Sequence, residues 1–139
     1  MAAFLWAQIE DAENITRERL AIWDRYHAML APLEQRELLR RPVVPAHCTH
    51  NGHLYYVLLP QGTDRDTVIR KLRQAEIQAV FHYVPLHSAP AGMRFGRGHG
   101  DLPRTTDLSE RLLRLPFWIG LQEAQQQRIC DSLGAILGG

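Results

Sequence analysis

The stretch Val80-Phe81-His82-Tyr83-Val84-Pro85-Leu86-His87 decides the fold that we expect around it. Its β-branched and aromatic residues predict a short strand, and its proline, which has no backbone N–H to donate, predicts where that strand ends. On a pleated strand His82 and Tyr83 lie on opposite faces. A Gly- and Pro-rich segment follows over residues 88–100. Because strand ends that lead into loops often carry functional groups, we expect His82, Tyr83 and His87 to lie near a site.

Outward from this strand, the hydrophobic periodicity predicts alternating helices and strands. Upstream, it predicts a helix over residues 2–31, a short helix near 33–40, a central strand over 53–59 and a helix capped by Thr63. Downstream, it predicts a loop over residues 88–104, a helix from Asp107, a short strand over 115–118 and a last helix over 122–137.

The order of these segments predicts the fold class. A right-handed crossover makes the two longer strands parallel, and the short strand fits beside or between them in the opposite sense. We therefore expect an α/β fold of the α+β kind, with a small three-stranded mixed sheet packed against helices. With 139 residues the chain forms one domain. Residues 42–139 are assigned to the sheet and its helices, and residues 1–31 to a long leading helix.

The composition excludes several classes of protein. The chain has 16 Lys and Arg against 15 Asp and Glu, a net charge of +1, and its basic residues are scattered. This balance argues against binding to nucleic acid or to an anionic membrane surface. No apolar stretch is long enough to span a membrane, and no basic leader indicates secretion, so we expect a cytoplasmic protein. Cys48 and Cys130 have neither redox nor zinc spacing and are expected to be free thiols.

The first turns of the leading helix, residues 2–7, are apolar on every side. A helix of this kind is normally surrounded by protein. We expect either another subunit to cover it, giving a homodimer through the N-terminal helix, or the chain to be a fragment of a longer protein.

Two groups of residues invite a chemical interpretation that their context does not favour. Histidines and a cysteine suitable for zinc occur together: His47, Cys48, His50 and His53. Zinc needs three or four such ligands to converge, whereas the surrounding Pro, Asn and Gly predict an open loop, so a zinc-binding domain is kept only as an alternative. The single lysine, Lys71, is expected to point to solvent and not to form a Schiff base, which requires a desolvated amine.

The glycines between residues 92 and 100 resemble a phosphate-binding loop only in composition. Such a loop requires a helix immediately after its glycines, and the next predicted helix begins only near Asp107. We expect a mobile loop from which Arg94 or Arg97 closes on an anionic ligand.

Four segments, in this order, resemble one family. They are Ala2–Glu10, His53–Val57, Phe81–His87 with the Pro-Ala-Gly that follows it, and Ser109–Pro116. All four are similar to segments of the sugar-nucleotide aminotransferases of the DegT/DnrJ/EryC1/StrS family, and together they cover nearly the whole chain. The resemblance implies the C-terminal portion of a fold-type-I, pyridoxal-phosphate-dependent enzyme.

The resemblance also implies partners and chemistry. Such enzymes are homodimers that move an amino group from glutamate to a dTDP-4-keto-6-deoxy-hexose, here for lipopolysaccharide or enterobacterial common antigen precursors. The large domain with its Schiff-base lysine is absent, so no catalytic residue carries over, and we expect this chain alone to bind no cofactor and to be inactive. Substrate contacts carry over to His82, Tyr83, His87 and Arg94. A standalone binding or oligomerisation module is the alternative.

Overall fold

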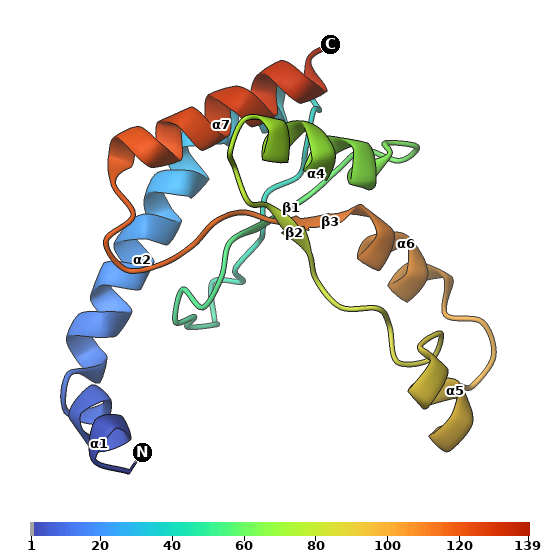
Figure 1. The fold of residues 1–139 in the computed structure, drawn as a ribbon, viewed down its shortest axis with the longest axis horizontal. Coiled ribbons are helices and arrows are strands. Elements are labelled where there is room, and N and C mark those ends of the chain that lie inside the picture. The colour runs from blue at the N-terminus through green and yellow to red at the C-terminus, as the bar shows by residue number, and fades with distance from the viewer. Residues whose placement is uncertain (1) are drawn as a thin grey trace.

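The computed structural model describes residues 2–139 (Figure 1). Its elements are α1 (Ala2–Glu10), α2 (Ala12–Met29), α3 (Ala31–Gln35), β1 (Tyr56–Leu58), α4 (Arg65–Gln74), β2 (Val80–Phe81), α5 (Pro90–Phe95), α6 (Pro103–Arg111), β3 (Leu112–Arg114) and α7 (Glu123–Leu137). In Figure 1 the sheet lies at the centre with α4 and α7 above it, while α2 with α1, and α6 with α5, extend from it as two arms. Within the described part of the chain, no helix is long and apolar enough to cross a membrane.

The sheet has the order β1-β3-β2, with β3 antiparallel to both neighbours. Consequently β1 and β2 run parallel to each other and the short strand lies between them in the opposite sense, which confirms the expected fold class. The position expected for the short strand was wrong. The strand is Leu112–Arg114, directly after α6, and not residues 115–118. Pro116 cannot extend the ladder because it has no N–H, and its carbonyl instead accepts a hydrogen bond from the Tyr26 hydroxyl at 2.9 Å.

The central position predicted for β1 is also wrong, because the middle strand of the sheet is β3. On its outer side β1 is covered by a two-way backbone bridge, in which Arg40 N donates to Leu58 O at 2.8 Å and Leu58 N donates to Arg40 O at 2.9 Å. The connector after α3 therefore protects the edge that a bare strand would expose.

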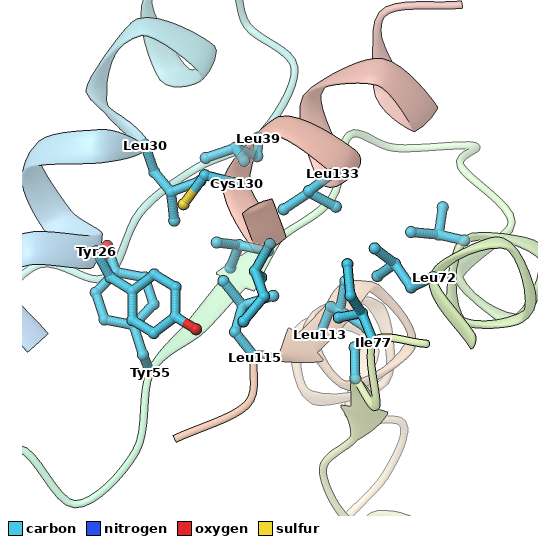
Figure 2. Packing of buried hydrophobic residues seen from close by; sticks show 14 of the residues in the cluster. Tyr26, Leu30, Leu39, Tyr55, Leu72, Ile77, Leu113, Leu115, Cys130 and Leu133 are labelled. Carbon is cyan, nitrogen blue, oxygen red and sulfur yellow. The ribbon is translucent and has the colours of Figure 1, made fainter. Parts of the chain in front are cut away.

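The hydrophobic core lies on one face of the sheet (Figure 2). Leu113 projects from β3 toward Leu72 of α4 and Leu133 of α7, and all three are completely buried. Tyr26 of α2 and Leu30, directly after that helix, close the core at its other end. Side chains alternate along a strand, so the residues on either side of Leu113 belong to the opposite face and are half-exposed. Helices therefore cover the face that carries Leu113. The opposite face is more open, although Leu58 of β1 is buried there.

The predicted leading helix is two helices, because the chain breaks between α1 and α2 at Asp11 (φ −103°, ψ 12°). The Asp11 carboxylate accepts a hydrogen bond from the Asn14 side chain, a local bond that competes with regular helix. No residue of α1 is buried, and Phe4 is 72% exposed and Trp6 65% exposed. The apolar turns identified in the sequence are thus uncovered by the rest of the described chain.

Two further boundaries differ from expectation because of capping. The N-cap of α4 is Asp64 and not Thr63, since the Asp64 carboxylate accepts hydrogen bonds from the backbone N–H groups of Asp66 and Thr67, at 3.0 and 3.2 Å. The predicted loop over residues 88–104 contains α5 and the start of α6, each of which has a proline in its first turn. Proline suits that position because the first turn needs no N–H donor.

The connector over residues 45–53 is fastened to α2 by aromatic and polar contacts. Trp23 stacks on His27 with ring centroids 4.7 Å apart, and His50 lies 4.5 Å from the same indole. Arg19 Nε donates to Gly52 O at 3.1 Å. Gly52 has φ +57°, and a Cβ there would meet the Arg19 carbonyl carbon at 3.0 Å, so this approach requires glycine.

His27 makes folding stability depend on pH. Its Nδ1 lies 3.2 Å from the Tyr55 hydroxyl, and Asp24, Glu34, Arg41 and His50 also act on it. Burial, and then the charge of Arg41, lower the pKa of His27 below its ordinary 6.5. The folded state therefore binds the proton less readily than the unfolded chain. The stabilisation is complete above about pH 6.5 and is lost as the pH falls through the lowered folded pKa.

We expect His27→Gln to flatten the dependence of the unfolding free energy on pH between about 7.5 and 5.5, because the glutamine does not titrate. Urea unfolding at several pH values measures this slope. A residual slope is expected from His82, whose pKa is also lowered. His47→Gln, which removes a histidine at an exposed position, is the matched control. An unchanged slope in the His27 variant would contradict the assignment.

Candidate functional site

A hollow of about 790 Å³ lies between α5 and α6, and we call it the α5–α6 hollow. Its polar lining includes His87 and, from α6, Thr106, Asp107 and Glu110. His87 Nε2 lies 3.3 Å from Thr106 Oγ1, so the predicted site residue is held against α6. A hydrogen bond from Arg111 lowers the pKa of Asp107, and the Asp107 carboxylate stays ionised. Arg111 also donates to Leu59 O at 2.8 Å, which ties α6 to the end of β1.

The position of His87 follows from a tight turn after the proline of the opening stretch. The backbone N–H groups of Ser88 and Ala89 both donate to Pro85 O, at 3.0 and 2.9 Å. α5 then folds back so closely that a Cβ on Gly92 would lie 1.7 Å from Leu86 O. Only glycine allows this packing, which places α5 beside His87.

His82 and Tyr83 form a separate pair at the end of β2. Their ring centroids are 4.6 Å apart in an edge-to-face arrangement, and Tyr83 is 74% exposed. Burial, and then the charges of Arg114 and His53, lower the pKa of His82. At neutral pH its imidazole is therefore uncharged, with one nitrogen able to donate and the other to accept a hydrogen bond.

Arg94 lies apart from both groups. It sits in the last turn of α5 with its guanidinium 5.0 Å from the centre of the Phe95 ring, and it does not line the α5–α6 hollow. The structure thus places the predicted residues in three separate positions: His87 in the hollow, His82 with Tyr83 on the strand end, and Arg94 on the outer surface of α5.

Sequence reasoning missed the groups that surround these residues. Thr106 lay in a predicted loop because the first turn of α6 was not recognised, although Pro103 marks it. Arg114 also lay outside the predicted strand, because the prediction began at Leu115 whereas β3 ends at Arg114. The influence of His53 on His82 had no local signal, because β1 and β2 are brought near each other only by β3.

The four possible zinc ligands do not converge. Across residues 2–139, no three His, Cys, Asp or Glu side chains are grouped so as to hold a metal ion. His50 packs on Trp23 instead, and the Cys48 thiol is exposed. The geometry gives the zinc alternative no support.

The described residues do not fit a complete pyridoxal phosphate site. Such a site needs a lysine amine beside a phosphate cradle. Lys71, the only lysine, is exposed on α4, and no lysine lines the α5–α6 hollow. The helix α4 packs on α7 at the covered face of the sheet, away from the open one. A cofactor amine would have to come from elsewhere.

The comparison with protein families gives one match over nearly the whole chain. The model described as the DegT/DnrJ/EryC1/StrS aminotransferase family matches residues 1–134. A similar curated protein is the dTDP-3-amino-3,4,6-trideoxy-alpha-D-glucose transaminase of Micromonospora megalomicea subsp. nigra. It is 29% identical over 123 residues, which are 87% of this chain and 32% of that protein.

Solved structures agree with this match. S. venezuelae DesV, in complex with a ketimine intermediate, has a TM-score of 0.85 at 26% identity and is matched over 99% of this chain and 36% of its own. A DegT DnrJ EryC1 StrS aminotransferase from Brucella abortus has a TM-score of 0.81 at 27% identity, over 99% of this chain and 35% of its own. The chain thus spans about a third of the length of the relatives that it matches.

Proposed function

We propose, since this chain belongs to the DegT/DnrJ/EryC1/StrS aminotransferase family, that it is the C-terminal part of a pyridoxal-phosphate-dependent sugar-nucleotide aminotransferase. The observation that carries the proposal is the match over residues 1–134 together with the shared fold, both of which extend over only a third of the relatives. On this proposal residues 1–31 connect two domains and residues 42–139 form the small domain. The uncovered apolar surface of α1 supports the presence of further protein beside it.

The proposed reaction moves an amino group from glutamate to a dTDP-4-keto-6-deoxy-hexose. The Micromonospora relative is named for a dTDP-amino sugar, which supports this substrate class. Our finer proposal is an activity like that of dTDP-4-amino-4,6-dideoxygalactose transaminase, in a cytoplasmic homodimer that supplies precursors of lipopolysaccharide or enterobacterial common antigen.

The residues of this chain are proposed to bind and orient the substrate. His87, fixed by Thr106, presents a ring at the wall of the α5–α6 hollow. His82 and Tyr83 offer neutral donors and acceptors suited to sugar and phosphate oxygens. Arg94 is proposed to contact an anionic ligand when α5, which carries it, moves toward that ligand. The cofactor supplies the chemistry of amino transfer, and its lysine lies outside these residues.

A chimaera tests the proposal. Residues 1–139 replace the corresponding segment of an active family member, and glutamate-dependent amination of dTDP-4-keto-6-deoxy-glucose is measured. We expect activity that falls at least tenfold in His87→Ala, because a positioned polar contact to substrate is lost. His47→Ala, far from the site in sequence and exposed, is the control. A folded, cofactor-loaded chimaera that is inactive on all keto-sugar nucleotides would refute the function.

The 139-residue chain alone is expected to form no stoichiometric adduct with pyridoxal phosphate, because Lys71 has no surrounding site. Addition of the cofactor, borohydride reduction and intact-mass analysis measure this. Weak labelling of the N-terminal amine, to the same extent in the wild type and in a Lys71→Arg variant, fits the proposal. Saturable labelling at Lys71 would show that this chain holds a cofactor site of its own.

A standalone binding or oligomerisation module is the second candidate, and it is favoured by α1, in which no residue is buried. Light scattering separates the two, since a module gives a defined oligomer through α1 and a fragment gives non-specific association. Trp6→Ser would convert a defined oligomer to monomer, because a large apolar contact is removed.

A further inference from the structure

The connector beside α2 holds Asn51 and Gly52 in a defined turn. Asn51 is exposed, and its side-chain Oδ1 accepts a hydrogen bond from the backbone N–H of His53 at 3.1 Å, the pattern of an Asx turn. Gly52 is buried, and its carbonyl oxygen accepts a hydrogen bond from Arg19 Nε at 3.1 Å. An exposed carboxamide therefore lies directly beside a backbone N–H that is fixed in place.

His50 brings a base to that N–H. The Gly52 nitrogen lies 3.4 Å from His50 Nδ1, and the same imidazole ring packs on Trp23 with centroids 4.5 Å apart, which fixes its direction. An unprotonated ring nitrogen in this position accepts a proton, and such contacts are commonly long before reaction begins. On the other side of the turn, the His53 N–H already bonds to Asn51 Oδ1, where negative charge develops if a nucleophile attacks the carboxamide.

We propose that Asn51 is a modification site, at which the Gly52 backbone nitrogen attacks the side-chain amide with His50 as the base. Glycine suits this role because no side chain hinders the approach of its nitrogen. The nucleophile, the base and the donor to the developing oxyanion all come from residues 50–53 and meet in one turn. The local structure thus favours deamidation of Asn51.

The second asparagine of the sequence has none of these groups. Asn14 is followed by Ile15, whose branched side chain crowds the backbone nitrogen. The Ile15 N–H is also engaged, since it donates to Asp11 O at 3.0 Å. Asn14 therefore serves as an internal control within the same molecule.

The reaction needs only water as a second reactant. The Gly52 nitrogen forms a bond to Asn51 Cγ while the Cγ–Nδ2 bond breaks, and its electron pair leaves with Nδ2. The nitrogen that departs takes up the proton that His50 removed from Gly52 and leaves as ammonia. Water then opens the five-membered imide. Opening at Cγ gives aspartate, and opening at the main-chain carbonyl gives isoaspartate, in which the main chain runs through Cγ.

Isoaspartate is expected to release the connector from α2. It adds one carbon to the main chain before Gly52, where a Cβ would already meet the Arg19 carbonyl carbon at 3.0 Å. We expect hydrogen exchange over residues 50–53 to accelerate at least about tenfold in this form. Asn51→Asp keeps the normal main chain and an oxygen acceptor for the His53 N–H, so it is expected to exchange as the wild type does. Equal exchange in the isoaspartate form and the wild type would overturn the release.

Peptide mapping by mass spectrometry, on the 139-residue chain incubated at neutral pH, tests the modification itself. We expect a gain of about 1 Da in the peptide that contains Asn51, preceded by an imide that is lighter by about 17 Da. No gain is expected at Asn14. The conversion is expected to be faster in the folded chain than in a synthetic peptide of residues 46–56, which lacks Trp23 and Arg19. Conversion that is slower in the folded chain than in the peptide would overturn the proposal.

Variants test the base. His50→Ala is expected to slow the conversion at least about tenfold, because a positioned general base is lost. Free imidazole is expected to restore the rate in this variant and to have little effect on the wild type, which a merely structural role of His50 would not produce. His47→Ala, exposed in the same connector, is the matched control, and circular dichroism confirms that each variant is folded. An unchanged rate in His50→Ala, or a slowed rate that imidazole does not restore, would overturn the role of His50.

Discussion

Leu113→Ala is expected to lower the free energy of unfolding by about 3 to 5 kcal/mol, the range for a buried leucine whose cavity does not collapse. Leu113 is completely buried and pairs with both Val57 and Phe81, so its side chain lies where the sheet meets α4 and α7. The cavity would be enclosed by strands that the backbone ladder holds in place. Urea unfolding followed by far-ultraviolet circular dichroism gives the value.

Leu112→Ala is the matched control for this prediction. It removes the same atoms one residue earlier on β3, from a half-exposed side chain on the open face. We expect a loss below about 1.5 kcal/mol, because much of that surface already contacts water. Equal losses at the two positions would mean that the sheet is covered on both faces, contrary to the structure.

Gly92→Ala is expected to detach α5 from the turn before it. The added Cβ would lie 1.7 Å from Leu86 O and 2.7 Å from its carbonyl carbon, and these are backbone atoms that cannot rotate away. We expect hydrogen exchange over residues 86–96 to accelerate at least tenfold. The global free energy of unfolding should change by less than about 1 kcal/mol, because α5 contains no buried residue and opens as a local unit.

Gly98→Ala controls for the loss of a glycine in the same region. A Cβ there would have His87 Cβ as its nearest neighbour, at an ordinary 3.7 Å, so exchange over residues 86–96 should remain unchanged. In the chimaera, Gly92→Ala is expected to weaken substrate binding while Gly98→Ala does not, since only the former displaces the wall of the α5–α6 hollow. Unchanged exchange in Gly92→Ala would show that α5 packs differently.

Elements with a strong local pattern were predicted well. The alternation of apolar runs and helical faces was enough to derive a three-stranded mixed sheet with the short strand in the opposite sense, which the structure confirms. The last helix, predicted over residues 122–137, is α7 at Glu123–Leu137. The predicted ends of helices were wrong where a single residue decides them. Examples are Asp11 between α1 and α2 and Pro103 at the start of α6.

The amino-acid sequence by itself determined the fold class, the family resemblance and the approximate segments, because burial periodicity and motif order are local properties of the chain. Only the tertiary structure decided which side chains meet. It separated Arg94 from His87, placed His50 on Trp23, and packed His82 against Tyr83. These contacts depend on strand order and register, in which a shift of one residue turns every side chain to the other face.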